Sequence, residues 1–268
     1  MNKLHISKQK QIIHLLVEGN SLRSTSRIVD VSINTVTKLL VDVGRACALY
    51  QDKTLVNLNC KRIQVDEIWS FCYSKQKNTA EDKKGRFGYG DVWTWTAICA
   101  DTKLVPSWLV ANRDVESANI FISDLADRLT NKIQLTSDGL KTYLEAIENA
   151  FGSNIDYSML VKIYGNSSEC IGTSKRTIAG SPNEKHVNTS FVERQNLTMR
   201  MCMRRFTRST NGFSKKVENH EYAIALHFMY YNFGRIHKTL KVTPAMEAGI
   251  TNHIWSLEEI ISLIGMIN

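Results

Sequence analysis

The sequence predicts a mixed α/β domain preceded by a small all-helical segment. Apolar residues recur with helical spacing up to about residue 46, and from residue 61 the pattern changes to short, apolar, strand-like runs. Beyond residue 116, strand-like and helical segments alternate, which is typical of a mixed sheet with flanking helices. The 268 residues are enough for one large core, or for a medium core with an accessory domain.

The N-terminal segment, residues 1–46, is expected to form three helices. Ser7 and Ser21 are suitable N-caps for the first helix and for a second helix over 22–29, and a third is expected over 33–44. Residues 30–32 form a short turn between the last two, which is the arrangement of a helix-turn-helix domain. Residues 47–60 are expected to be a linker.

The central region, residues 61–250, is predicted to be the catalytic domain. Strands over 62–71, 92–100 and 104–110 form a meander, and residues 75–90 form a loop. A helix (116–129), a strand (133–137), a helix (141–150) and a strand (159–163) follow. A polar stretch (164–188) then precedes helices over 190–204 and 216–233. Residues 251–268 are expected to be a C-terminal helix.

Composition narrows the class of protein. Apolar residues make up 43% and charged residues 22%, as in ordinary globular proteins. The chain has no apolar run of membrane-spanning length and no signal-peptide core, so it is expected to be cytoplasmic and nucleoid-associated. Six scattered cysteines without a C-x-x-C pair predict neither a zinc site nor disulfides.

The charge distribution favours a nucleic-acid partner. The chain has 34 Lys and Arg against 26 Asp and Glu, a net charge of +8. Residues 194–216 contain seven cations and no acid. The expected DNA contacts are Arg27, Ser32, Asn34, Thr35 and Lys38 around the helix-turn-helix, and Arg194, Arg200, Arg204, Arg205 and Arg208 after it. The alternatives are a helical bundle that binds no DNA and a solvated basic face.

Three acids are candidates for metal ligands and catalytic groups. Asp66 lies within an apolar strand, where a charge is costly unless it is paired or binds metal. Strand alternation directs Asp66 and Glu67 to opposite faces, so only one of them can be the inward ligand. Asp138 ends a strand before Gly139, and carboxyl ends of strands often carry ligands in α/β proteins. Glu193 lies on a helix that leads into the basic run.

Each candidate also has an ordinary structural interpretation. Asp138 could simply form a turn, and Glu193 could be a solvated helix residue. Glu67 and Asp91 are the main alternative acids, and Asp91 fits a turn better. Helical Glu145 and Glu148 fit a solvated surface. His237 could contact DNA, although a lone histidine near aromatic residues is more often structural.

The segments 64–69 (QVDEIW), 136–139 (TSDG) and 190–196 (SFVERQN) together resemble the DDE transposases and retroviral-type integrases, in particular the IS1 family of insertion-sequence transposases. Arg200 follows Glu193 at a spacing that many relatives share. The tail residues that match the family are Tyr231, Asn232, Phe233, His237, Leu240, Thr243, Pro244 and Ala245. The resemblance covers roughly residues 60–250.

The resemblance implies an RNase H-like fold in which Asp66, Asp138 and Glu193 hold two Mg²⁺ ions, with Mn²⁺ as an alternative. It implies cleavage of insertion-element ends and joining of the 3′-hydroxyl to target DNA by a homo-oligomer, without a small-molecule cofactor. Two features depart from it. Asp138 and Glu193 are 55 positions apart (193 − 138), more than in retroviral-type integrases, and the IS1-type N-terminal zinc-binding cysteines are missing.

Two rival functions stay open from the sequence. One is an RNase H-like nuclease that hydrolyses DNA without strand transfer. The other is a helix-turn-helix regulator with an inactive catalytic domain, which the three intact acids disfavour.

Overall fold

The structure is a computed structural model that describes residues 4–165 and 169–266. Residues 166–168, part of the polar stretch expected at 164–188, lie outside the described residues. The chain divides into two compact units. Unit 1 comprises residues 4–54, 69–92 and 197–266, and unit 2 comprises residues 55–68 and 93–196. The predicted boundaries at 46, 60 and 250 stay predictions.

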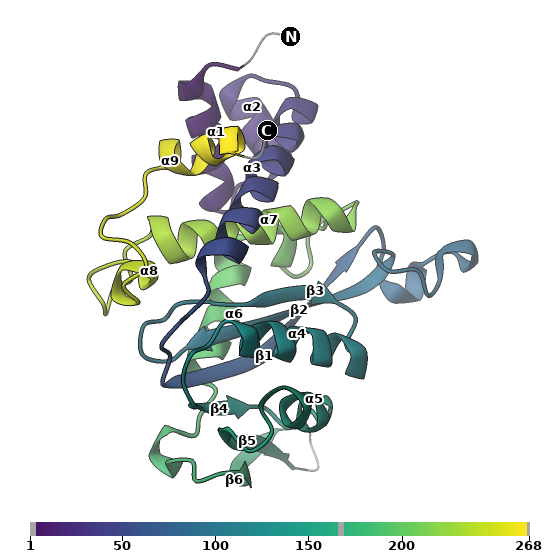
Figure 1. The fold of residues 1–268 in the computed structure, drawn as a ribbon. Coiled ribbons are helices and arrows are strands. Elements are labelled where there is room, and N and C mark those ends of the chain that lie inside the picture. The colour runs from purple at the N-terminus through teal and green to yellow at the C-terminus, as the bar shows by residue number, and fades with distance from the viewer. Residues whose placement is uncertain (1–3, 166–168, 267–268) are drawn as a thin grey trace. The chain divides into compact units, whose positions relative to one another are not determined.

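Unit 2 contains most of a six-stranded mixed sheet with the strand order β3-β2-β1-β4-β5-β6 (Figure 1). The bounds are β1 Arg62–Cys72, β2 Gly90–Cys99, β3 Trp108–Ala111, β4 Ile133–Ser137, β5 Ile155–Tyr164 and β6 Cys170–Ala179. β4 pairs in parallel with both β1 and β5, whereas β2–β3 and β5–β6 are antiparallel. This confirms the predicted mixed α/β class with an RNase H-like sheet.

Two helices cover one face of this sheet in Figure 1, α4 (Val115–Asp127) and α5 (Thr142–Phe151). Asp114 caps α4 by accepting a hydrogen bond from the Ser117 amide at 2.8 Å. Beneath the helices, the fully buried rings of Trp95, Phe121 and Tyr143 contact one another through Trp95. This aromatic core fixes α5 against the strands.

The polar stretch 164–188, for which the sequence predicted no helix or strand, contains regular structure. It contains β6, which lies at the edge of the sheet, and the 3₁₀ turn η3 (Glu184–His186). Most β6 side chains are exposed, so the strand carries little of the apolar alternation by which sequence analysis detects strands. The third predicted strand, 104–110, is also shorter than expected and begins at Trp108.

Unit 1 begins with α1 (Ile6–Val17), α2 (Leu22–Val29) and α3 (Ile33–Thr54), seen in Figure 1 as the purple to dark-blue helices. Ser21 caps α2, and Asp30 adopts a left-handed conformation with φ 53° in the turn that follows. The predicted helix-turn-helix elements are therefore present.

The expected linker over 47–60 is wrong in its first part, because α3 continues to Thr54. Cys47 and Gln51 are fully buried on α3. Gln51 donates a hydrogen bond to the carbonyl of Ala225 in α7 at 3.0 Å. Burial on one face keeps the last turns of the helix ordered, although their sequence is weakly amphipathic.

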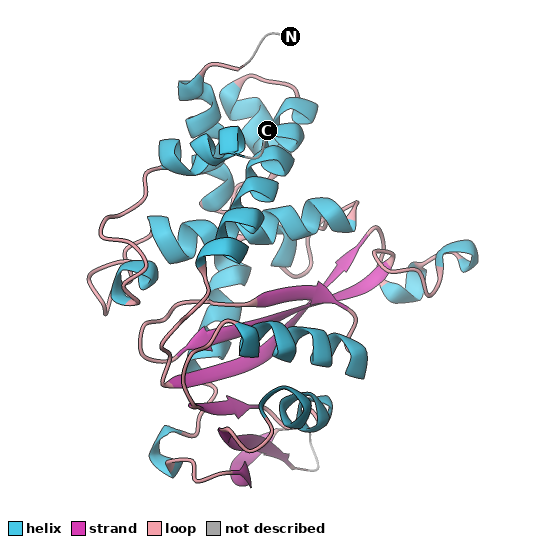
Figure 2. Ribbon diagram, viewed as in Figure 1, coloured by secondary structure: helices cyan, strands magenta, loops and turns pink. Residues whose placement is uncertain are grey.

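The rest of unit 1 is mostly helical, as the cyan ribbons of Figure 2 show. Between β1 and β2 lie the 3₁₀ turns η1 (Gln76–Asn78) and η2 (Glu81–Lys83). The C-terminal elements are α6 Ser190–Cys202, which begins in unit 2, η4 Arg204–Phe206, α7 Val217–Met229, the π-helix η5 Tyr230–Gly234, α8 Pro244–Glu247, α9 Leu257–Ser262 and η6 Leu263–Met266.

Two helix predictions need correction here. The helix expected over 190–204 ends at Cys202, and the one expected over 251–268 begins only at Leu257, which Ser256 caps with a capping box. Within the described residues, no helix combines the length and hydropathy that a membrane span needs.

Candidate functional site

The parallel pairing of β1 and β4 brings two of the predicted acids to the same level. The register pairs Arg62 with Gln134 and Gln64 with Thr136. Continued by two residues, this register aligns Asp66 with Asp138, which follows the last residue of β4. Residues far apart in sequence thus become neighbours through strand pairing.

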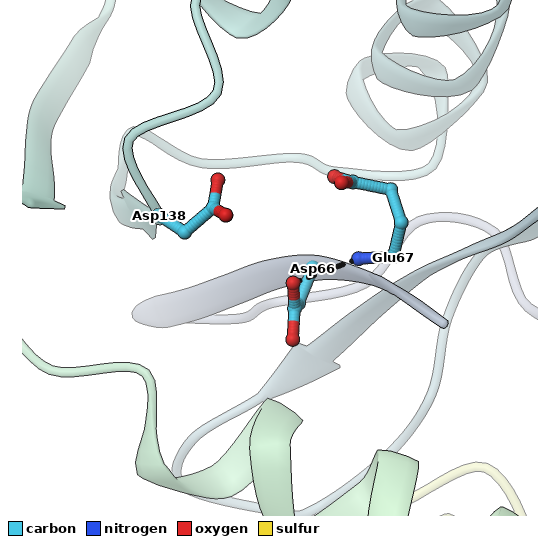
Figure 3. Close-up of side chains that lie close together, drawn as sticks. All are labelled: Asp66, Glu67 and Asp138. Carbon is cyan, nitrogen blue, oxygen red and sulfur yellow. Dashed lines mark hydrogen bonds between the residues drawn. The ribbon is translucent and has the colours of Figure 1, made fainter. Parts of the chain in front are cut away.

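Three carboxylates gather at this point. Asp66, Glu67 and Asp138 each offer an oxygen, and these oxygens lie within 4.8 Å of one another. In Figure 3 the Asp66 and Glu67 side chains leave β1 on opposite sides. The two side chains thus lie on opposite faces, as expected, but Asp138 extends beyond its strand end, where oxygens of both approach it. That only one of them is a ligand stays a prediction.

The Asp66 carboxylate is held from two sides. Its Oδ1 accepts a hydrogen bond from the Glu67 amide at 2.9 Å, and its Oδ2 accepts one from Asn196 Nδ2, also at 2.9 Å. Burial, and then the neighbouring Asp138 carboxylate, raise the pKa of Asp66 to about 6. Glu193 contributes to this rise and Lys162 opposes it. A pKa raised in this way marks a place where positive charge would be stabilised.

Glu67 is anchored on the opposite side of β1. The Tyr143 hydroxyl donates to its Oε1, and Arg113 Nε donates to its Oε2 at 3.1 Å. The Arg113 guanidinium also lies 4.7 Å from the ring centroid of Trp93. Burial is the main cause that raises the pKa of Glu67, to about 7. Both oxygens of Glu67 thus have donors, as those of Asp66 do, and the Glu67 side chain is only 1% exposed.

Asp138 combines its place in the cluster with the turn role considered from the sequence. Its Oδ1 accepts a hydrogen bond from the Leu140 amide at 2.9 Å, which stabilises the turn after β4. The two interpretations of Asp138 are therefore compatible, because the turn fixes the direction of the carboxylate.

Gln64 fixes the start of α6, the helix that carries Glu193. Its Oε1 accepts hydrogen bonds from the amides of Phe191 and Val192, at 2.8 and 3.1 Å. These amides belong to the first turn of the helix and have no partner within it. Gln64 and Asp66 lie two positions apart on β1 and share one face of the strand. That face therefore aligns the first turns of α6 with Asp66.

Glu193 does not belong to the group of acids within 4.8 Å. Its Oε1 pairs with Lys162 Nζ at 2.8 Å and accepts a hydrogen bond from Thr189 at 3.1 Å. The side chain is 44% exposed. Its electrostatic effect on Asp66 nevertheless indicates that the two carboxylates interact.

Asn196 is a residue of this site that sequence reasoning did not single out. It follows Glu193 by three positions, close to one helical turn, and so shares its side of α6. While Nδ2 donates to Asp66, the buried Oδ1 has no hydrogen-bond partner in the part of the chain that the structure describes. The i, i+3 spacing from a suspected ligand was the available signal, but it would have been weak without the fold.

The predicted basic residues are not equivalent in the structure. Arg204 lies in η4, beyond the end of α6, and so does not share the helix of Glu193. Arg205 is partly buried and donates to Ser214 Oγ at 2.7 Å, and burial lowers its pKa to about 10. Arg194 and Arg208 are exposed, and Arg200 is half-buried. DNA contact by these residues stays a prediction.

Around the helix-turn-helix, Ser32 acts first as a cap, since its Oγ accepts from the Thr35 amide at 3.1 Å. Asn34 and Arg27 are exposed, and Lys38 is exposed but pairs with Asp42 at 2.8 Å. These side chains are placed where they could contact DNA, and that contact stays a prediction.

The alternative residues lie elsewhere. Asp91 is exposed near the start of β2, and Glu145 and Glu148 are exposed on α5. The ring of His237 contacts Thr239 Oγ1 at 3.0 Å. The six cysteines are all free, four of them buried.

The comparisons with known proteins matched solved structures only. No family model matches the sequence, and no curated protein matches it either. A chain of the piggyBac transposase synaptic complex with hairpin DNA aligns over 78% of this chain and 52% of its own length, with 12% identity and a TM-score of 0.32. A chain of a pre-cleavage Mos1 transpososome aligns over 59% and 60%, with 10% identity and a TM-score of 0.23. This chain thus spans between half and two thirds of those chains.

Proposed function

We propose that this chain is a DDE-type transposase, which cleaves the ends of an insertion element and joins the 3′-hydroxyl to target DNA. The observation that carries the proposal is the convergence of Asp66 and Asp138, with α6 tied to the same place by Gln64 and Asn196. This tie keeps Glu193 within electrostatic reach of Asp66.

The donor set fits hard divalent cations. All candidate ligand atoms are oxygens, and burial together with their mutual repulsion raises the pKa of Asp66. The Asn196 Oδ1 atom beside them is buried without a hydrogen-bond partner among the described residues. We assign Asp66, Asp138 and Glu193 as ligands of two Mg²⁺ ions, with Mn²⁺ as an alternative. The chemistry that such a pair supplies when bound is activation of the attacking hydroxyl and stabilisation of the leaving oxygen.

The chain's own residues supply the positioning. Asn196 and the Glu67 amide orient Asp66, and the turn at Leu140 orients Asp138. When no metal ion is bound, the Lys162 ammonium group pairs with the Glu193 carboxylate. Because the Glu67 side chain is only 1% exposed and pairs with Arg113 on the opposite side of β1, we assign this acid a supporting role and not a ligand role.

DNA is the proposed partner. The helix-turn-helix of residues 1–46 would recognise the element ends, and the cations of residues 194–216 would hold phosphates near the acids. Because two ends must be joined, the active form is proposed to be a homo-oligomer that needs neither a small-molecule cofactor nor a covalent protein–DNA intermediate. The IS1 family is the specific assignment that the sequence motifs favour.

A strand-transfer assay tests the proposal. The chain is mixed with Mg²⁺, plasmid target and a duplex carrying the DNA that flanks its gene, with the 3′ end already cleaved. Joined products are expected. Hydrolysis without joining would favour the nuclease alternative. Binding without either reaction, in both Mg²⁺ and Mn²⁺, would favour the regulator.

A further inference from the structure

Thr189 is a buried residue directly before α6 to which the proposed function gives no role. Its carbonyl oxygen accepts a hydrogen bond from the Glu193 amide at 3.0 Å, which is the first backbone bond of the helix. Thr189 therefore occupies the N-cap position. A threonine hydroxyl at that position usually accepts a hydrogen bond from the second or third amide of the helix, which here belong to Phe191 and Val192.

Other side chains already satisfy the first three amides of α6. Asn188 Oδ1 accepts a hydrogen bond from the first amide, that of Ser190, at 3.3 Å. Gln64 Oε1 accepts hydrogen bonds from the second and third amides, at 2.8 and 3.1 Å, and Gln64 Nε2 donates to Asn188 at 2.8 Å. A residue of β1 thus does the capping that falls to the N-cap side chain in other helices, so the Thr189 hydroxyl is available for a different contact.

That contact is with the Glu193 carboxylate. Thr189 Oγ1 donates a hydrogen bond to Glu193 Oε1 at 3.1 Å, and Lys162 Nζ lies 2.8 Å from the same oxygen. The other oxygen, Oε2, has no hydrogen-bond partner among the residues that the structure describes. Glu193 therefore has one oxygen that is held by two donors and one that is open to a ligand.

The two donors restrict a side chain that would otherwise be mobile. Glu193 is 44% exposed, and an exposed glutamate retains much of its rotamer freedom unless contacts fix it. Partners that bind the second oxygen of a metal-ligating carboxylate orient the ligand and raise the affinity for the metal. We propose that Thr189 is a positioning residue for Glu193: its hydroxyl, together with Lys162, holds Oε1, so that Oε2 is the atom that Glu193 offers to a divalent cation.

This inference rests on the proposed two-ion site and adds a residue that determines the ligand atom of its third acid. Thr189 itself contacts neither DNA nor a cation in this arrangement, because its hydroxyl donates to Glu193. Removal of the hydroxyl should therefore weaken cation binding. The reaction should proceed at nearly the normal rate once the cation concentration is high enough to saturate the site.

Titration of the chain with Mn²⁺ in a calorimeter tests the inference independently of activity. Thr189→Val and Thr189→Ala remove the hydroxyl and should bind Mn²⁺ about tenfold more weakly, whereas Thr189→Ser keeps it and should bind like the wild type. Thr96→Val is the matched control, because the buried Thr96 hydroxyl lies in the same unit and has no hydrogen-bond partner within the described part of the chain. In DNA cleavage, Thr189→Val should need about tenfold more Mg²⁺ for half-maximal rate, with kcat at saturating Mg²⁺ within about twofold of the wild type.

The outcomes separate the two proposals. Equal Mn²⁺ affinity of the wild type, Thr189→Val and Thr189→Ala would overturn the positioning role and leave the metal site intact. Equal weakening by Thr189→Ser and Thr189→Val would also overturn it, because the hydroxyl would then have no special part. Absence of Mn²⁺ binding by the wild-type chain would contradict the proposed function itself.

Discussion

At the scale of single residues, the Asp66 carboxylate is the most informative group in the site. Asp66 belongs to β1, and its partly buried side chain bonds to Asn196 of α6 and lies beside the Asp138 carboxylate. Among the described contacts, no cationic side chain donates a hydrogen bond to it. The arrangement disfavours the ionised form and would stabilise a bound cation.

A pH titration of stability follows from this burial. Because the folded pKa of Asp66, about 6, exceeds the unfolded value of about 3.9, the folded state holds the extra proton between these values. The Asp66 contribution to stability is therefore present below about pH 4 and lost as pH rises to about 6. Relative to Asp66→Asn, the wild-type chain should lose up to about 3 kcal/mol over this range. Urea unfolding of both proteins in EDTA measures the difference, and parallel pH curves would contradict the assigned burial.

At the scale of elements, the seating of α6 on β1 links the fold to the site. Gln64 caps the first turn of the helix, and Asn196 ties its second turn to Asp66. If this seating positions Glu193, changes at the cap should reduce activity even though Gln64 itself is not a proposed ligand.

Gln64→Ala tests the seating. Loss of the buried acceptor for two helix amides should cost about 1–3 kcal/mol of stability and should lower cleavage mainly through kcat. Gln134→Ala is the matched control, because Gln134 also bonds a neighbouring backbone, at Asn183, but not α6. Equal losses of activity in both variants would show that the α6 cap has no special role.

Some parts of the site follow from local features of the sequence, and others depend on tertiary packing. Asp66 and Asp138 could be predicted because an acid in an apolar strand and an acid at a strand end are local features. The shared cluster with Glu67 depends on the β1–β4 register, and the Asn196 contact depends on how α6 packs. β6 was missed because an exposed edge strand lacks apolar alternation, and the end of α3 was missed because tertiary burial extends it.

At the scale of the whole molecule, the N-terminal helices are integrated into unit 1. α3 packs on α7, and at Gly44 the two helices lie so close that an added Cβ would be 2.3 Å from the carbonyl oxygen of Tyr222. The helix-turn-helix therefore shares a core with residues 197–266, which explains why unit 1 does not end at residue 46.

Gly44→Ala tests this integration. On an isolated helix the change would stabilise by about 1 kcal/mol, but here a backbone atom blocks the methyl group. We expect a net loss of about 2 kcal/mol or more, measured by thermal unfolding. Gly172→Ala has open space around the added Cβ and should be tolerated. Stabilisation by Gly44→Ala would show that α3 and α7 do not pack as described.

The central claim is that Asp66, Asp138 and Glu193, and not Glu67, hold the catalytic cations. Metal-dependent DNA cleavage by Asp66→Asn, Asp138→Asn, Glu193→Gln and Glu67→Gln tests it most directly, with exposed Glu148→Gln as control. The first three variants should lose about a thousandfold or more, Glu67→Gln about tenfold, and the control nothing. Full activity in Glu193→Gln together with loss in Glu67→Gln would contradict the claim and assign the site to Asp66, Glu67 and Asp138.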